Sequence, residues 1–151
     1  MIKTNREYIA EYNQLLKECD MVYHLAAAKL DMSDCAFWIL YTLHDSGQAI
    51  KQSDICDSAS MPRQTVNSAL KKLEKDGYLT LSRIDGKMGK SIHLTDKGEQ
   101  LVHKHIVPVM RAEEKACALF TDEEKTTFLS VFHTLVERLN HEISALYTEG
   151  K

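Results

Sequence analysis

Between Ile55 and Thr95 the hydrophobic pattern of the sequence changes from a helical period to a strand period. Two short runs come first, with apolar residues at helical spacing and a tight turn between them, and Pro62 and Gly77 bracket the second run. Two runs of alternating apolar and polar residues follow, joined by a loop rich in glycine and lysine. A helix, a turn, a second helix and a β-hairpin in this order predict a winged helix-turn-helix, which places its second helix in a groove of DNA.

Capping and turn residues set the expected boundaries of the other elements. Ser33 is placed to cap a helix that Gly47 ends, and Thr121 with Glu124 has the pattern of a capping box. Pro108 lies inside a helical run and predicts a kink there. The expected elements are helices over 5–30, 34–45, 51–58, 62–76, 96–118 and from 121 onward, and strands over 78–84 and 91–94. The fold class is therefore mainly α, with about six helices and a small β-hairpin wing.

The two ends of the chain predict long helices with an apolar stripe, longer than a small winged domain needs for its own core. Such stripes usually bury against each other or against a second copy of the chain. We expect one domain over 1–151, with the winged helix-turn-helix at 33–95 and helical parts at 1–32 and 96–151 that form a homodimer. The alternative is a bundle within one chain.

Lysine and arginine are concentrated in one part of an otherwise acidic chain. Residues 62–92 hold seven of them against three acids, which gives this segment a net charge of +4. The whole chain has a net charge of −3, so the remainder sums to −7. A basic island in an acidic protein favours a surface that binds a polyanion, and double-stranded DNA is the partner that the predicted fold accepts.

The expected helix over 62–76 has two distinct faces. Val66, Leu70 and Leu73 share one face and are expected to pack inward. The opposite face carries amide, hydroxyl and cationic side chains, of which Gln and Asn suit adenine and Arg and Lys suit guanine. The candidates for base readout are Arg63, Gln64, Thr65, Asn67, Ser68 and Lys71. The candidates for phosphate or wing contacts are Lys72, Lys75, Arg83, Lys87 and Lys90. The alternative interpretation is a polar face that is only solvated.

Several classes of function find no support in the sequence. Nucleophile motifs, phosphate-binding glycine loops and paired carboxylates are lacking, so we expect neither catalysis nor a cofactor. The seven histidines are scattered without ligand spacing, and no metal site is expected. The four cysteines lie far apart with no CxxC pair, no apolar run reaches the length of a membrane span, and the N-terminus lacks a signal-peptide pattern. These features favour a cytoplasmic protein with reduced thiols.

The motif residues resemble those of the MarR family of winged helix-turn-helix regulators along nearly the whole chain. They are Ile55, Ser60-Met61, Thr65-Val66-Asn67, Leu70, Leu73-Glu74, Gly77-Tyr78-Leu79, Leu94-Thr95 and Gly98. The resemblance implies an obligate dimer that binds a pseudo-palindromic operator, usually as a repressor. Such dimers often release the DNA when a small molecule or an oxidant binds to them. The chain departs from the family in the wing, where Gly86 and Met88 occupy the positions of the usual Asp-x-Arg.

The resemblance also implies a pocket for an aromatic effector. Its lining here would include Tyr12, Tyr23, His24, Phe37, Trp38 and Tyr41, although an aromatic stripe of this kind is also typical of an ordinary core. Cys19 lies where some relatives keep a reactive cysteine, but its acidic neighbours disfavour a thiolate, and we expect it to be buried and inert. Two rival functions stay open: a redox or metal sensor, and a winged-helix adaptor that binds proteins through an apolar or acidic outward helix face.

Overall fold

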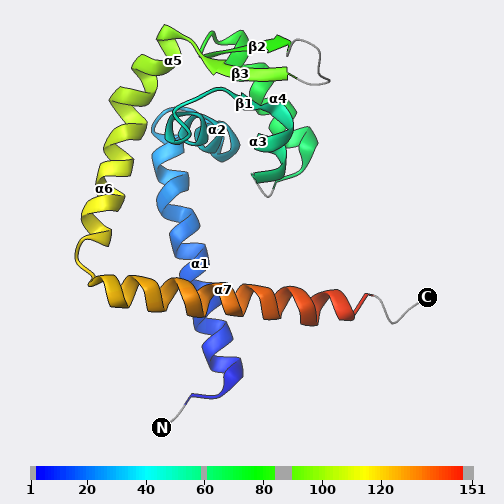
Figure 1. The fold of residues 1–151 in the computed structure, drawn as a ribbon, viewed down its shortest axis with the longest axis vertical. Helices are drawn as coiled ribbons and strands as arrows, with labels where there is room; N and C mark the ends of the chain where they lie inside the picture. The colour runs from blue at the N-terminus through cyan, green and yellow to red at the C-terminus, as the bar shows by residue number, and fades with distance from the viewer. Residues whose placement is uncertain (1–2, 59–60, 84–89, 148–151) are drawn as a thin grey trace. The chain divides into compact units, whose positions relative to one another are not determined.

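A computed structural model describes residues 3–58, 61–83 and 90–147 of the chain. The chain falls into two units, Met1–Val109 and Met110–Lys151, and each is described by itself. The elements in chain order are α1 (Asn5–Ala28), α2 (Asp34–Asp45), β1 (Ile50–Lys51), α3 (Gln52–Ser58), α4 (Arg63–Lys75), β2 (Leu79–Arg83), β3 (Lys90–Leu94), α5 (Asp96–Leu101), η1 (Val102–Ile106), α6 (Val107–Cys117) and α7 (Asp122–Ala145) (Figure 1).

The helix starts follow from local hydrogen bonds. The Ser33 hydroxyl accepts from the backbone N–H of Ala36 at 3.2 Å and begins α2, as the sequence predicts. At α7 the Thr121 hydroxyl accepts from the N–H of Glu124 at 3.2 Å, while the N–H of Thr121 donates to the Glu124 carboxylate at 2.8 Å. The expected capping box is therefore confirmed. A second capping box, Thr4 with Glu7, begins α1 and was not predicted.

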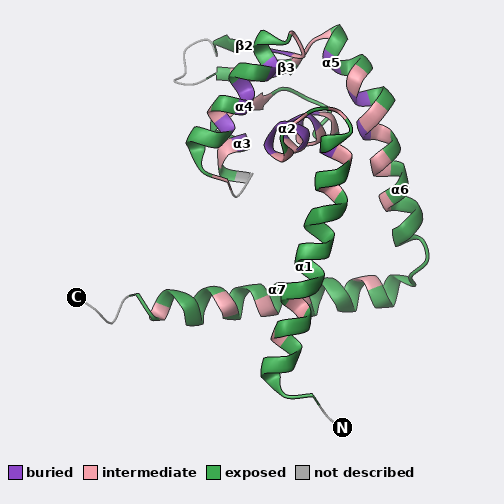
Figure 2. Cartoon of the chain, turned by 180° about the vertical axis from the view of Figure 1, so that it is seen from behind, coloured by how far each residue is buried: buried purple, intermediate pink, exposed green. Residues whose placement is uncertain are grey.

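The core of the first unit is built around α2. Phe37, Ile39 and Leu40 of this helix are 0–1% exposed. They are joined in the core by buried residues of α3, α4, the strands and η1: Ile55, Val66, Leu70, Leu79, Ile92, Val102 and Ile106. The contrast with the terminal helices is plain in Figure 2, where α1 and α7 are mostly exposed. On α1 only Ala27 is buried, and α7 has no buried residue over its length.

The sheet has one strand more than the predicted hairpin. Its order is β1-β3-β2, all antiparallel, with β3 in the centre. Ile92 of β3 lies opposite Ile50 on one side and Leu81 on the other, and its side chain is fully buried. The two-residue strand β1 thus fastens the segment before α3 to the wing, which fixes where the helix-turn-helix begins.

The predicted helix over 96–118 is interrupted before Pro108. The N–H of Val107 donates to the carbonyl of Val102, five residues back, and η1 is a π-helical turn. Proline has no N–H to donate and its ring clashes with the preceding turn of an α-helix. A widened turn directly before Pro108 is one way to relieve that clash. If α5, η1 and α6 are counted as one interrupted helix, the described residues contain six helices. The predicted fold class is therefore confirmed.

No helix in the described ranges is both long enough and apolar enough to span a membrane.

Candidate nucleic-acid interface

The position of α4 is set by its apolar face and by its two ends. Val66, Leu70 and Leu73 are at most 2% exposed, as predicted. Pro62 occupies the N-cap, one residue before the first helical position, and the first turn closes by hydrogen bonds to its carbonyl from Thr65 and Val66. Gly77 ends the helix with a φ of +77°, a conformation that costs other residues more. The polar face of α4 is thereby held outward by the packing of the apolar one.

Five of the six candidates for base readout are exposed, and four of these, Gln64, Thr65, Ser68 and Lys71, have no ion pair in the described ranges. The Ser68 hydroxyl donates to the carbonyl of Gln64 at 2.9 Å, so that its oxygen still has lone pairs to offer.

Asn67 differs from the other candidates and needs a correction. It is half-buried, and its Oδ1 accepts a hydrogen bond of 2.7 Å from Nε2 of Gln52 on α3. The prediction that Asn67 lies on the outward face with the other candidates is therefore only partly met, because its Oδ1 is already engaged, and its role in base readout stays a prediction. The helical spacing places Asn67 at the border of the two faces, where a partner from α3 reaches it. Gln52 itself was not predicted, because no local pattern links it to a residue fifteen positions later.

Arg63, the sixth candidate, is exposed but paired. Its Nη2 lies 3.2 Å from Oδ1 of Asp57 on α3, and the two side chains are 74% and 66% exposed. An ion pair this exposed contributes about 0–1 kcal/mol to stability. A phosphate or a guanine edge is therefore able to replace Asp57 as the partner of Arg63.

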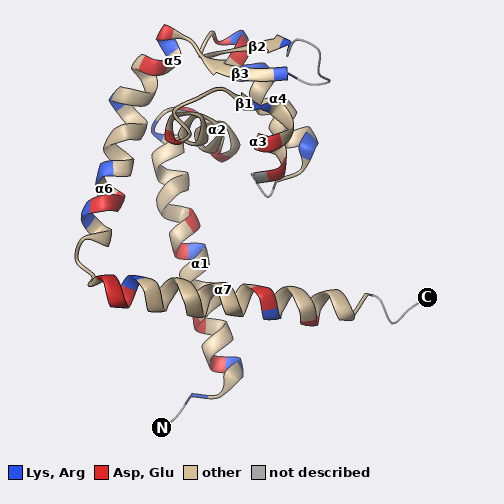
Figure 3. Cartoon of the chain, in the orientation of Figure 1, with Lys and Arg blue, Asp and Glu red and all other residues tan. Residues whose placement is uncertain are grey.

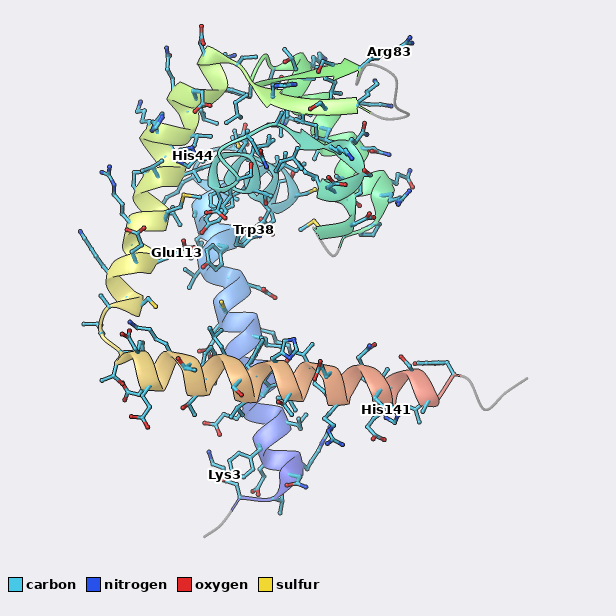
Figure 4. The ribbon with its side chains drawn as sticks, viewed as in Figure 1. Lys3, Trp38, His44, Arg83, Glu113 and His141 are labelled. Atoms are coloured by element: carbon cyan, nitrogen blue, oxygen red, sulfur yellow. The ribbon has the colours of Figure 1, made fainter. Side chains whose placement is uncertain are left out.

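Lysines at the end of α4 and cations at the hairpin extend the basic surface. Lys72 and Lys75 lie in the last turn of α4 and are exposed. Arg83 of β2 and Lys90 of β3 are exposed and lie directly opposite each other in the sheet register. Like charges in that arrangement repel, and an anion between them relieves the repulsion. Figure 3 shows the cations on α4 and at the hairpin ends, and Figure 4 shows Arg83 at the end of β2. Lys87, with Gly86 and Met88, lies outside the described residues.

The structure brings together four of the six predicted pocket residues. The Trp38 ring centroid lies 4.7 Å from that of Tyr23, 5.7 Å from that of Phe37 and 5.2 Å from that of Tyr41. Phe37 is fully buried and belongs to the core. His24 is exposed and its Nδ1 lies 2.9 Å from the Asp34 carboxylate, while Tyr12 is half-buried on α1. Two hollows among the described residues, of about 390 Å³ and about 250 Å³, are lined by other residues.

Histidines meet at the larger of the two hollows. His44 and His93 line it together with Glu99. The His44 ring lies edge-on to that of His103, with 5.3 Å between centroids, and Nε2 of His103 is 3.8 Å from the Glu99 carboxylate (Figure 4). Within the described ranges, however, no three His, Cys, Asp or Glu side chains are arranged to hold a metal ion.

The cysteines also require a correction. Cys19 is exposed on α1, so the expectation that it is buried is wrong for the single chain. The reason is that α1 buries only its last turn. Cys35 on α2 is buried and Cys56 on α3 is half-buried. Burial raises the pKa of the Cys35 thiol, with a smaller contribution from Cys56.

Comparisons with known proteins agree with this geometry. Residues 30–87 match the model of the MarR family. The chain is 24% identical over 138 residues to the HTH-type transcriptional regulator YwoH of Bacillus subtilis, covering 91% of this chain and all of YwoH. It is 32% identical over 102 residues to the HTH-type transcriptional regulator PecS of Dickeya dadantii, covering 66% of this chain and 61% of PecS. The crystal structure of the S. aureus MepR–DNA complex superposes with a TM-score of 0.75 at 18% identity, covering 90% of this chain and 99% of MepR.

Proposed function

We infer from the match of residues 30–87 to the model of the MarR family that the chain is one of these transcription regulators, and we propose that it is a homodimeric repressor of a pseudo-palindromic operator. The chain is a DNA-binding transcription regulator and not an enzyme. In this proposal residues 33–95 form the DNA-binding part, and 1–32 with 96–151 form the dimerisation part.

The observation that carries the proposal is the division of α4 into a buried apolar face and an outward polar face. Gln64, Ser68 and Lys71 are exposed on a helix whose opposite side is fixed in the core. An α-helix fits the major groove, and these side chain types bond to base edges there. Gln64, Thr65, Ser68 and Lys71 read bases in this proposal, together with Arg63 and Asn67.

The phosphate contacts come from the cations around that face. Lys72 and Lys75 at the end of α4, and Arg83 and Lys90 at the hairpin, are exposed where a duplex backbone passes a docked recognition helix. Lys87 is proposed to join them from the wing loop. If the dimer neutralises about 6–10 phosphates, its affinity falls about 10³–10⁵-fold between about 50 and 200 mM salt.

The terminal helices support a homodimer. Large apolar side chains on both are about half exposed or more in the single chain, among them Leu15, Val22 and Leu25 on α1 and Phe128, Leu129 and Val131 on α7. Exposed apolar surface on this scale marks an interaction site. A two-fold partner also suits a palindromic operator, whose half-sites lie about one helical turn apart.

A small aromatic molecule is proposed to relieve repression. The rings of Tyr23 and Tyr41 both contact the ring of Trp38, and all three residues are half-buried, so that part of their surface is exposed. The effector binds against these rings in the dimer.

The adaptor alternative predicts an apolar or acidic outward face on α4. The described face is instead amide, hydroxyl and cationic, which favours DNA.

The test is selection of bound genomic fragments with the purified chain, followed by footprinting. The expected result is an enriched palindrome with half-sites about one turn, or 10 base pairs, apart. Recovery of fragments without a common sequence contradicts the proposal.

A further inference from the structure

Two amide side chains meet between the helices of the helix-turn-helix. Gln52 is the first residue of α3, and its Nε2 donates to Oδ1 of Asn67 at 2.7 Å. Both side chains are half-buried. The bond therefore turns the carbonyl of Asn67 toward α3 and leaves its NH2 group as the part that faces away from Gln52.

We propose that Gln52 is a positioning residue that fixes Asn67 as a hydrogen-bond donor toward DNA. This inference rests on the proposed function, and it replaces the adenine-reading role expected of Asn67. An asparagine reads adenine with both ends of its amide, accepting from N6 and donating to N7. With Oδ1 engaged by Gln52, only the donor end is presented.

The donor end of Asn67 is accessible. Within the described ranges no hydrogen bond from Nδ2 is found, and no side-chain nitrogen or oxygen there is both buried and without a partner. Nδ2 therefore reaches solvent, on a helix whose neighbouring positions one turn away, Arg63 and Lys71, are exposed. A duplex docked on this face meets Nδ2.

The orientation of the Asn67 amide decides which bases it can pair with. Guanine O6 and thymine O4 accept hydrogen bonds in the major groove, whereas adenine N6 and cytosine N4 donate them. A fixed donor thus favours the keto bases guanine and thymine over cytosine, which offers it no acceptor, and over adenine, which offers it only N7. A bond that only held α3 to α4 has no such consequence, because packing does not distinguish keto from amino edges.

Replacing Gln52 with glutamate is expected to reverse the preference. The carboxylate only accepts hydrogen bonds, so the Asn67 amide must flip to donate to it and must present Oδ1 outward. Gln52→Met keeps a similar volume but removes the bond, and leaves the Asn67 amide free to rotate. Loss of one neutral hydrogen bond corresponds to about a 2–10-fold change in an equilibrium.

The experiment is sequence selection from a randomised library with the wild-type chain and with the Asn67→Ala, Gln52→Glu and Gln52→Met variants. Gln48→Glu is the matched control, since Gln48 is exposed near α3 and gains the same charge without touching Asn67. The base read by Asn67 is the position at which Asn67→Ala relaxes the preference. Thermal melting of each variant verifies that it is folded.

At that position we expect guanine or thymine for the wild type and adenine or cytosine for Gln52→Glu. Gln52→Met is expected to reduce the preference about 2–10-fold without inverting it, and Gln48→Glu to leave it unchanged. An unchanged preference in folded Gln52→Glu overturns the inference, as does an Asn67→Ala variant that relaxes no position. A wild-type chain that selects no motif at all overturns the proposed function instead.

Discussion

The winged-helix part and the terminal helices bury their apolar residues to opposite degrees. In α2 half of the twelve residues are buried, and α4 has four buried residues on one face. In α7, twenty-four residues long, none is buried, and α1 of the same length buries one. The first region is complete within one chain, whereas the second has an apolar surface that a single chain leaves exposed. The outward face of α4 thus rests on a self-contained core, whereas the apolar residues of the long helices lie on the surface of the single chain.

The largest effect is expected from a truncation in the self-contained region. Leu40 on α2 is fully buried, so Leu40→Ala should lower the free energy of unfolding by about 2–5 kcal/mol. Urea denaturation at equal chain concentration measures the change. The matched variant Leu119→Ala, at a side chain that is 84% exposed in the single chain, should change the unfolding free energy of the monomer by less than about 0.5 kcal/mol. Equal losses in the two variants would remove the distinction between the regions.

The next effect concerns the exposed helices. Phe128 on α7 is 64% exposed and its ring is stacked on that of Phe132 at 5.6 Å between centroids. If α7 lies in the dimer interface, Phe128→Asp should raise the dimer dissociation constant at least about tenfold, since a buried Phe contributes about 1.5–3 kcal/mol. Sedimentation equilibrium measures this constant, and Glu123→Asp is the conservative control on the same helix. A wild-type chain that stays monomeric at high concentration contradicts the proposed assembly.

A smaller effect, on DNA affinity, is expected for the cations beside the outward face of α4. Lys72→Ala should weaken binding to every DNA sequence alike and should reduce the salt slope of the affinity by about one. Lys115→Ala on α6, outside the winged-helix part, is the control and should leave the slope unchanged. Fluorescence anisotropy at several salt concentrations gives both values. A loss confined to one sequence would assign Lys72 to base readout.

The smallest effect is expected at the helix caps. The N–H of Thr121, and then its hydroxyl, lower the pKa of the Glu124 carboxyl below its ordinary value of 4.5. A carboxyl with a lowered pKa in the folded state stabilises the fold above its unfolded pKa, and this contribution is lost as the pH falls below about 4.5 through the folded value. Glu124→Gln should therefore flatten the acid limb of the melting temperature against pH. An acid limb as steep as that of the wild type would show that the cap does not contribute to it.

The sequence predicts those features that depend on residues close together in the chain. Ser33, Thr121 and Gly77 act on their own helix ends, and the structure places them where the pattern requires. The strand β1 was missed because two residues have no period, and only the distant Ile92 makes Ile50 part of a sheet. Gln52 was missed for the same reason: its partner Asn67 comes from another helix. The exposure of Cys19 likewise depends on how little of α1 the first unit covers.

In the proposed function the outward face of α4 reads base sequence. The most direct measurement is the affinity of the wild type and of Gln64→Ala for the selected operator and for a scrambled duplex of the same length. Gln64→Ala is expected to lose about 1–3 kcal/mol of binding free energy on the operator and almost nothing on the scrambled duplex. An equal loss on both duplexes, or no loss on either, would contradict the proposed function.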